Sequence, residues 1–241
     1  MVTFLASGMP KFLLDFADSF KQNFIEKDRY QYLVDGVLVT LKITLFAVLI
    51  GIAIGFVVGI IRSTYENTGK LKVLNKICKL YITVIRGTPV VVQLMIIYYG
   101  IFQTVDIDPV IVAVLSFGIN SGAYVAEIIR SGIMSIDQGQ FEAGRSLGFN
   151  YIQTMRYIIM PQAVKNVLPA LGNEFIVLLK ETSVAGYISL QDLTKGGDII
   201  RSQTYDVFMP LLAVASVYLV LVMIFSHFVQ KLERRLNNGK R

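Results

Sequence analysis

The run ITLFAVLIGIAIGFVVGII, from Ile43 to Ile61, contains no charged residue. A helix of about twenty apolar residues crosses the hydrocarbon core of a bilayer. A second such run, from Val207 to Gln230, lies near the other end of the chain. The sequence therefore predicts an integral membrane protein. The composition of the 241 residues, 54% hydrophobic and 17% charged, agrees with this class.

Three further spans are expected between these two runs, although glycine, proline and ionisable residues interrupt them. We place them at Leu74–Phe102, Pro109–Ile133 and Val167–Ile188. The prediction is an all-α integral membrane protein with five transmembrane helices. Residues 31–241 would form its membrane domain, and no linker marks a second domain.

Lysine and arginine gather in the cytoplasmic loops of membrane proteins, so their distribution predicts the orientation. One side of a five-span protein would carry most of them, namely Arg62, Lys70, Lys72, Lys76, Lys79, Arg130, Arg145, Arg156, Lys165, Lys231, Arg234, Arg235, Lys240 and Arg241. The other side would carry only Lys11, Lys21, Lys27, Arg29, Lys195 and Arg201. The N-terminus is therefore expected outside and the C-terminus inside. The net charge of +6 then reflects cytoplasmic loops and no nucleic-acid partner.

Residues 1–30 have a different pattern. Phe12, Phe16, Phe20 and Phe24 recur every four residues among charged side chains, which indicates an amphipathic helix. Such a helix lies along the membrane interface or packs on the outer surface of its own protein. The segment lacks the positively charged start and apolar stretch of a secretory signal, so we expect no cleavage.

The segment between the third and fourth spans, Met134–Asn166, is too long and too patterned for a simple connection. Residues Gln138 to Leu147 suit a short helix, and Gly148 can take the left-handed conformation that ends one. Asn150 can cap a second helix, which Pro161 is expected to stop. The sequence thus predicts a helical hairpin on the cytoplasmic surface.

Ala143 and Gly144 give this hairpin a patch of small residues where another backbone could approach closely. The segment resembles the EAA motif of ABC importer permeases, which reads Glu-Ala-Ala, three residues, Gly, nine residues and Ile-x-Leu-Pro. Here Glu142, Ala143, Gly144, Gly148 and Ile158-Ile159-Met160-Pro161 stand at those positions, with Gly for the second Ala and Met for Leu.

Three other strings resemble the branch of these permeases that carries polar amino acids. They are RGTPVVVQL (Arg86 to Leu94), GAYVAEIIRSGI (Gly122 to Ile133) and LPALGNEFIVLLKETS (Leu168 to Ser183). Together with the hairpin they cover most of the second to fourth spans in the order expected.

The resemblance implies a multi-pass permease of a prokaryotic cytoplasmic (inner) membrane that imports polar amino acids by alternating access. Its partners would be two ATP-binding-cassette ATPase subunits that bind ATP and Mg, a second permease chain, identical or paralogous, and an extracytoplasmic solute-binding protein. The hairpin would insert into a groove on the ATPase. The residues implied in this coupling are Glu142, Ala143, Gly144, Arg145, Gly148 and Pro161. Without the resemblance, the hairpin could also be a connector packed on its own bundle or a DNA-binding helix-turn-helix, which its two membrane tethers oppose.

Nothing in the chain fits the phosphate-binding loop G-x-x-x-x-G-K-[ST], so we expect no ATP hydrolysis by this subunit. The single histidine, His227, and the single cysteine, Cys78, offer neither a catalytic constellation nor a metal cluster. A non-enzymatic transport subunit without its own cofactor is predicted. The competing interpretations are an ATP-independent channel or secondary transporter, and a membrane enzyme.

Ionisable and polar residues at membrane depth are candidates for the solute path. They are Arg86, Glu127, Lys180, Glu181, Asn120, Ser121, Asn173, Thr182 and Ser183. A zwitterionic amino acid would suit a cavity that offers a carboxylate to one end and a cation to the other. The alternative is that these charges only pair with each other, as Glu127 could with Arg130 one turn later.

Overall fold

The computed structural model describes residues 11–238, which form helices joined by short connections, with no β-strand among them. The elements are α1 (Lys11–Phe20), the π-helix η2 (Lys21–Ile25), the 3₁₀-helix η3 (Glu26–Asp28), α2 (Tyr30–Thr68), α3 (Lys72–Arg86), α4 (Val90–Met95), the π-helix η4 (Ile96–Ile101), α5 (Pro109–Met134), α6 (Gln138–Ser146), α7 (Tyr151–Thr154), the π-helix η5 (Met155–Ile159), α8 (Met160–Glu181), the 3₁₀-helix η6 (Thr182–Ile188), α9 (Leu193–Thr204) and α10 (Phe208–Asn238).

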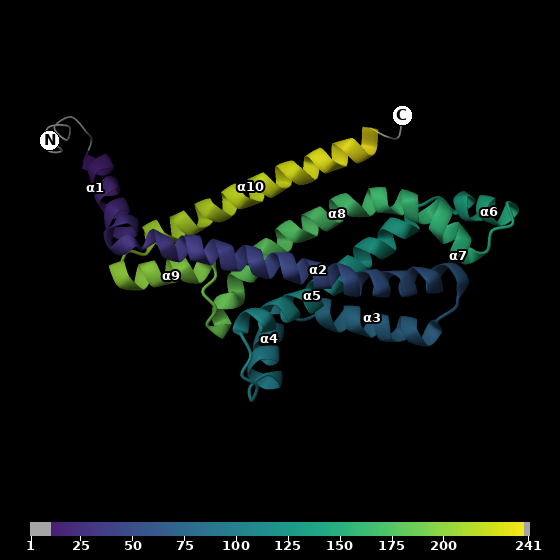
Figure 1. The fold of residues 1–241 in the computed structure, drawn as a ribbon, viewed down its shortest axis with the longest axis horizontal. Coiled ribbons are helices and arrows are strands. Elements are labelled where there is room, and N and C mark those ends of the chain that lie inside the picture. The colour runs from purple at the N-terminus through teal and green to yellow at the C-terminus, as the bar shows by residue number, and fades with distance from the viewer. Residues whose placement is uncertain (1–10, 239–241) are drawn as a thin grey trace.

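The long helices α2, α5, α8 and α10 run along the longest axis of the molecule (Figure 1). The short helices α6 and α7 lie at one end of this bundle, and α1 and α9 lie at the other. Helix α10 begins beside α9 and runs toward the end that holds α6. The bundle therefore has two ends with different accessory helices.

Helix α2 packs on α5 through glycines that repeat every fourth residue. A Cβ atom added to Gly51 would lie 2.8 Å from Oγ of Ser121, and one added to Gly55 would lie 2.5 Å from Cγ1 of Val125. Spacing of small residues by four puts them on one face and lets two helices approach closely in a membrane. The apolar run that predicted the first span thus also carries the most extensive contact between two helices of the described residues.

Helices α2, α5 and α10 are long and apolar enough to cross a membrane. Helix α2 is 39 residues long and extends well beyond the run Ile43–Ile61 at both ends. The fourth expected span is helical, but its regular part ends at Glu181 and continues as the 3₁₀-helix η6.

The second expected span, Leu74–Phe102, is not one straight helix. It is divided into α3 and the α4–η4 segment, whose axes differ by 102°. Pro89 has no backbone N–H and cannot continue the helix, and Gly87 ends α3 with an N–H bond of 3.0 Å to the carbonyl of Thr83. The sequence predicted one span here that glycine and proline interrupt, and the structure has a sharp bend at this interruption.

The amphipathic segment has its charged and apolar pattern, but its helix changes form before Phe24. Residues 1–10 of the expected segment, and the side chain of Phe12, lie outside what the structure describes. Phe16 and Phe20 are exposed, whereas Phe24 is buried against Ile200 and Met209. The segment therefore anchors at its end on its own protein and leaves an apolar face uncovered.

Polar contacts hold this anchor to the end of α9. The amide Nδ2 of Asn23 donates to Asp206 at 2.7 Å, and its Oδ1 accepts from the hydroxyl of Thr204 at 2.8 Å. Nε of Arg29 donates to Gln203 at 3.1 Å.

Candidate functional site

The hairpin between α5 and α8 has the two helix ends that its sequence predicts. Gly148 has φ +81°, its N–H donates to the carbonyl of Arg145 at 2.9 Å, and the N–H of Phe149 donates to that of Gly144 at 3.0 Å. These two bonds form a Schellman motif, which satisfies the last carbonyls of α6. Asn150 and Gln153 then exchange side-chain and backbone hydrogen bonds of 2.9 Å, a capping box that starts α7.

Gly144 faces the inside of the hairpin, which corrects the expectation of an Ala143–Gly144 docking patch. It is buried, and an added Cβ would lie 2.6 Å from Cγ2 and 2.7 Å from Oγ1 of Thr154. Small size at this position lets α6 lie directly on α7. Ala143 is exposed and remains part of the outer face.

The outer face of the hairpin is open and partly apolar. Glu142 is exposed beside Ala143. The side chain of Leu147 on this face is 71% exposed. Large apolar side chains left this open at a surface are typical of a face that another protein covers.

Pro161 does not stop the second helix, contrary to the prediction. It lies in the first turn of α8, where the missing N–H of a proline costs least. The preceding turn, η5, is a π-helix in which the N–H of Met160 bonds the carbonyl of Met155. The wider turn accommodates the proline, so the chain runs from α7 into α8 without a break.

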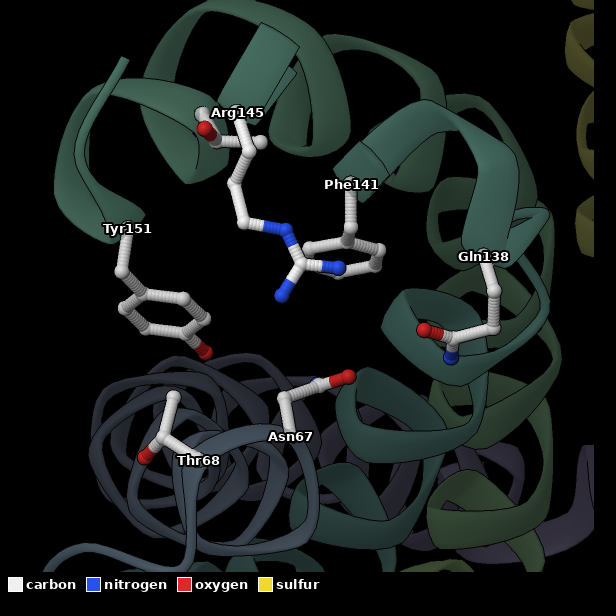
Figure 2. A pocket seen from close by; sticks show the side chains of 7 residues that line it. Asn67, Thr68, Gln138, Phe141, Arg145 and Tyr151 are labelled. Carbon is white, nitrogen blue, oxygen red and sulfur yellow. The ribbon is translucent and has the colours of Figure 1, made fainter. Parts of the chain in front are cut away.

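A cavity of about 320 Å³ separates the hairpin from the end of α2. Figure 2 shows the guanidinium of Arg145 entering it beside the ring of Phe141, with Gln138 and Asn67 across from Tyr151. The hairpin touches α2 at its edge, where the hydroxyl of Tyr151 donates to Thr64 at 3.4 Å. Space between a helix bundle and its hairpin leaves room for one to shift against the other.

Glu127 belongs to an ion network at the hairpin end of α2 and α5. It pairs with Arg130, which also contacts Glu66 at 3.0 Å, and Glu66 in turn contacts Arg62 at 3.2 Å. Glu127 thus forms the ion pair with Arg130 that was the alternative to solute contact.

The break after Arg86 is closed by a side chain that was not among the candidates. Nε2 of Gln93 donates to the carbonyls of Ile85 and Thr88 at 2.7 and 3.0 Å, which the bend leaves without helical donors. Its Oε1 accepts from Nδ2 of Asn120 at 3.1 Å. Asn120 is 2% exposed, and its Oδ1 accepts no hydrogen bond from residues 11–238. This leaves an unpaired buried acceptor beside the break.

Ser121 contacts a second residue that the candidate set lacked. Its hydroxyl donates to the carboxylate of Glu174 at 2.9 Å, and Glu174 is only 8% exposed. No cation of the described chain forms an ion pair with Glu174. A buried carboxylate without a cation is costly, so it usually has a function.

The remaining candidates lie on α8 and at the start of η6. Asn173 and Lys180 are exposed, and Glu181 and Ser183 are half-buried. Thr182 is buried and donates to a backbone carbonyl of its own helix at 2.8 Å, so its hydroxyl is already used. Glu181 stands two turns from Glu174, on the same side of the helix.

Arg86 lies at the end of α3 with its guanidinium 5.0 Å from the centre of the Tyr124 ring. Tyr124 lies one turn after Ser121 on α5, so Arg86 approaches the same part of that helix. The structure thus brings Ser121, Glu174, Glu181 and Arg86 into one region between α3, α5 and α8.

A family comparison decides what kind of protein carries this hairpin and this buried region. Residues 47–238 match the model of the binding-protein-dependent transport system inner membrane component. The chain belongs to this family. It is therefore a membrane permease subunit of an ABC importer and not an enzyme, and its ATPase is a separate partner.

Relatives of the permease agree over most of its length. A putative glutamine transport system permease protein GlnP of Rickettsia typhi is 38% identical over 207 residues, which are 85% of this chain and 93% of that protein. The glutamine transport system permease protein GlnP of Escherichia coli K12 is 41% identical over 167 residues, which are 68% and 76% of the two chains.

Solved structures show the same fold. A chain of an amino acid ABC transporter crystallised with histidines matches with a TM-score of 0.80 and 44% identity, over 88% of this permease and 98% of that chain. The inward-facing MetNI methionine ABC transporter matches with a TM-score of 0.75 at 20% identity, which shows a shared fold alone. The permease is thus an all-helical, multi-pass protein of the inner membrane.

Gln93 and Glu174 are the residues of this permease that sequence reasoning missed. Gln93 lies in the string RGTPVVVQL and Glu174 in LPALGNEFIVLLKETS, both of which carried the resemblance. A signal for Glu174 was present, because an acid amid apolar residues in the middle of an expected span is rare.

Proposed function

We propose that this permease imports polar amino acids, with glutamine as the first candidate, by alternating access in a prokaryotic cytoplasmic membrane. The proposal is carried by the 38% and 41% identity to permeases named for glutamine transport, over most of the chain. Two ATPase subunits that bind ATP and Mg, a second permease chain and an extracytoplasmic solute-binding protein would complete the importer.

The proposed topology has five crossings, formed by α2, the bent α3–η4 pair, α5, α8 and α10. The N-terminus lies outside and the C-terminus inside. The basic residues near α6 and α7, and the position of α1 and α9 at the opposite end of the bundle, support this orientation. Residues 1–30 then form the amphipathic segment and 31–241 the permease domain.

The hairpin would couple the permease to its ATPase in two ways. Glu142 and Ala143, with the exposed apolar neighbour Leu147, would contact the ATPase directly. Arg145 would act from the inner side of the hairpin, where its guanidinium enters the cavity beside α2. Gly144, Gly148 and Pro161 would act by shaping the hairpin, because each of them determines how α6, α7 and α8 fit together.

The solute path is proposed to pass the buried region beside the break in α3–α4. An amino acid carries an ammonium and a carboxylate, and charge-assisted hydrogen bonds recognise both. Glu174 and Glu181 would face the ammonium, and Arg86 and Lys180 the carboxylate. Asn120, Ser121, Asn173 and Ser183 would add neutral hydrogen bonds, and Glu127 and Thr182 would contribute less because they already have partners.

The path is tested by neutralising its charges one at a time in the reconstituted importer. Glu174→Gln should raise the solute concentration needed for half-maximal import, while Glu233→Gln, on the exposed part of α10, should leave it unchanged. Unchanged kinetics after neutralising Glu174, Glu181, Arg86 and Lys180 in turn would show that these charges have a structural role alone.

The solute class is tested by competition. Import of labelled glutamine into proteoliposomes would be challenged with unlabelled amide, basic and acidic amino acids. Strong competition by amides supports the proposal, and competition by none of the three classes refutes it.

A further inference from the structure

A groove of about 700 Å³ lies between α2 and the hairpin, and Tyr151 lines both this groove and the cavity that Arg145 enters. Its walls are largely apolar and come from two parts of the chain. Phe56 and Ile60 of α2 form one wall, and Ile152 of α7 and Met160 at the start of α8 form the other. An uncovered apolar groove of this size between helices accommodates a hydrocarbon chain.

Two basic side chains stand at the rim of this groove. Lys70 comes from the turn after α2, and Arg156 comes from η5 on the facing wall. Both are exposed, neither pairs with an acid of residues 11–238, and no carboxylate lines the groove. The rim therefore presents two positive charges without an acidic partner over an apolar floor, although the guanidinium of Arg156 also lies 5.6 Å from the centre of the Tyr157 ring.

The order of these features along α2 matches the depth profile of a bilayer. Phe56 and Ile60 belong to the uncharged run that ends at Ile61, whereas Lys70 follows the end of the helix. The apolar floor thus lies at the depth of acyl chains and the basic rim at the depth of headgroups. Basic groups at this level on the cytoplasmic side attract anionic lipids.

We propose that this groove binds one anionic glycerophospholipid of the cytoplasmic leaflet. Lys70 and Arg156 hold its phosphate, and an acyl chain lies along Phe56 and Ile60. This inference rests on the orientation given under the proposed function. Because one wall is α2 and the other belongs to the coupling hairpin, the lipid joins the part of the permease that spans the membrane to the part that receives the ATPase.

The test uses a tryptophan reporter, because the permease has no Trp of its own. Phe56→Trp is introduced, and the whole complex is reconstituted in phosphatidylcholine nanodiscs. One sample contains a small fraction of bromine-labelled phosphatidylglycerol, and a matched sample contains the same fraction of bromine-labelled phosphatidylcholine. Quenching is corrected with the complex that lacks the reporter. Phosphatidylglycerol should quench at a lower mole fraction, by about fivefold for each basic side chain that holds it.

Charge variants on the reporter background decide the cause of this preference. Lys70→Gln with Arg156→Gln should abolish it, whereas Lys76→Gln with Lys79→Gln, which removes the same charge from the exposed surface of α3, should preserve it. Equal quenching by the two lipids, or equal loss in both double variants, would overturn the proposal. The readout needs neither ATP nor solute, so its failure is distinct from a failure of the proposed import function.

Discussion

Replacing Gly144 by alanine should loosen the hairpin from within. The added Cβ would lie 2.6 Å from Cγ2 of Thr154, well inside the roughly 3.5–4.0 Å at which carbon atoms pack. Thr154 is 2% exposed and has little room to move. Overpacking of this kind costs about 1–3 kcal/mol. If the whole cost falls on the packed hairpin, its population relative to displaced forms drops about 5- to 150-fold.

The same geometry predicts a rescue. Thr154→Ala removes both atoms that the new Cβ would strike, and the next nearest atom is the terminal Cδ1 of Ile158 at 3.2 Å. Thr154→Ala alone loses a hydrogen bond of 3.0 Å to the carbonyl of Asn150, worth about 1 kcal/mol. The double variant should therefore be less impaired than Gly144→Ala, with a coupling energy of about 1–2 kcal/mol between the sites.

The assay is solute-stimulated ATP hydrolysis by the purified complex, with hydrogen exchange of residues 138–158 as a direct measure of hairpin packing. Gly144→Ala should lower stimulation and speed exchange, and Thr154→Ala should restore both. Ala143→Val, on the exposed face, should lower stimulation without rescue by Thr154→Ala. A double variant as impaired as Gly144→Ala would refute internal packing and place residue 144 against the ATPase.

Three further perturbations follow from the structure. Gly148→Ala should weaken coupling to the ATPase by about 1 kcal/mol because φ +81° is strained for alanine. Gly148→Asn should cost less, because asparagine tolerates this left-handed conformation better. Stimulated ATPase activity measures both variants, and equal effects would contradict this reasoning. Arg130→Gln should leave Glu127 and Glu66 without their shared cation and destabilise the purified permease by about 1–2 kcal/mol in thermal unfolding; an unchanged melting temperature would show that the network is dispensable. Asp192 is buried at the start of α9, where its carboxylate caps the helix by accepting from the backbone N–H of Lys195 at 3.0 Å. Burial raises the pKa of Asp192 to about 6, so the folded state binds its proton more tightly than the unfolded chain and loses stability as pH rises from about 4 to 6. Asp192→Asn keeps a capping side chain, and its stability advantage over the original protein should therefore grow across that range and level off above it; a constant difference would contradict the raised pKa.

Local features of the sequence were sufficient for the hairpin because each depends on neighbouring residues. Gly148 favours a left-handed helix end and Asn150 a helix start whatever surrounds them, so both were predicted correctly. The orientation of Gly144 depends on Thr154, ten residues away on another helix. No local rule distinguishes a glycine that faces its own hairpin from one that faces a partner.

Proline was misjudged for a similar reason. Pro89 lies in the break between α3 and α4, as the sequence predicted, whereas the chain stays helical through Pro161, which was expected to stop a helix. At Pro161 the preceding π-turn and the first-turn position remove the conflict, and neither is visible in the sequence.

The region around Glu174 contains contacts that the spacing of residues in the sequence cannot predict. Glu127 and Arg130 are one turn apart, so their ion pair was foreseeable. Ser121 on α5 and Glu174 on α8 are 53 residues apart in the chain, and their hydrogen bond depends on the close packing of α2, α5 and α8. That contact required the three-dimensional fold.

Whether this chain is the permease of an ATP-driven importer can be measured as import by the complete complex. Proteoliposomes would contain the permease, its ATPase and its solute-binding protein. Labelled glutamine would be added outside them, and ATP would be supplied to the side that faces the hairpin. Uptake against a gradient should require ATP and should be slower when Gly144→Ala loosens the hairpin. Uptake that continues without ATP or without the ATPase subunit would contradict it, and would identify the chain as a channel or secondary transporter.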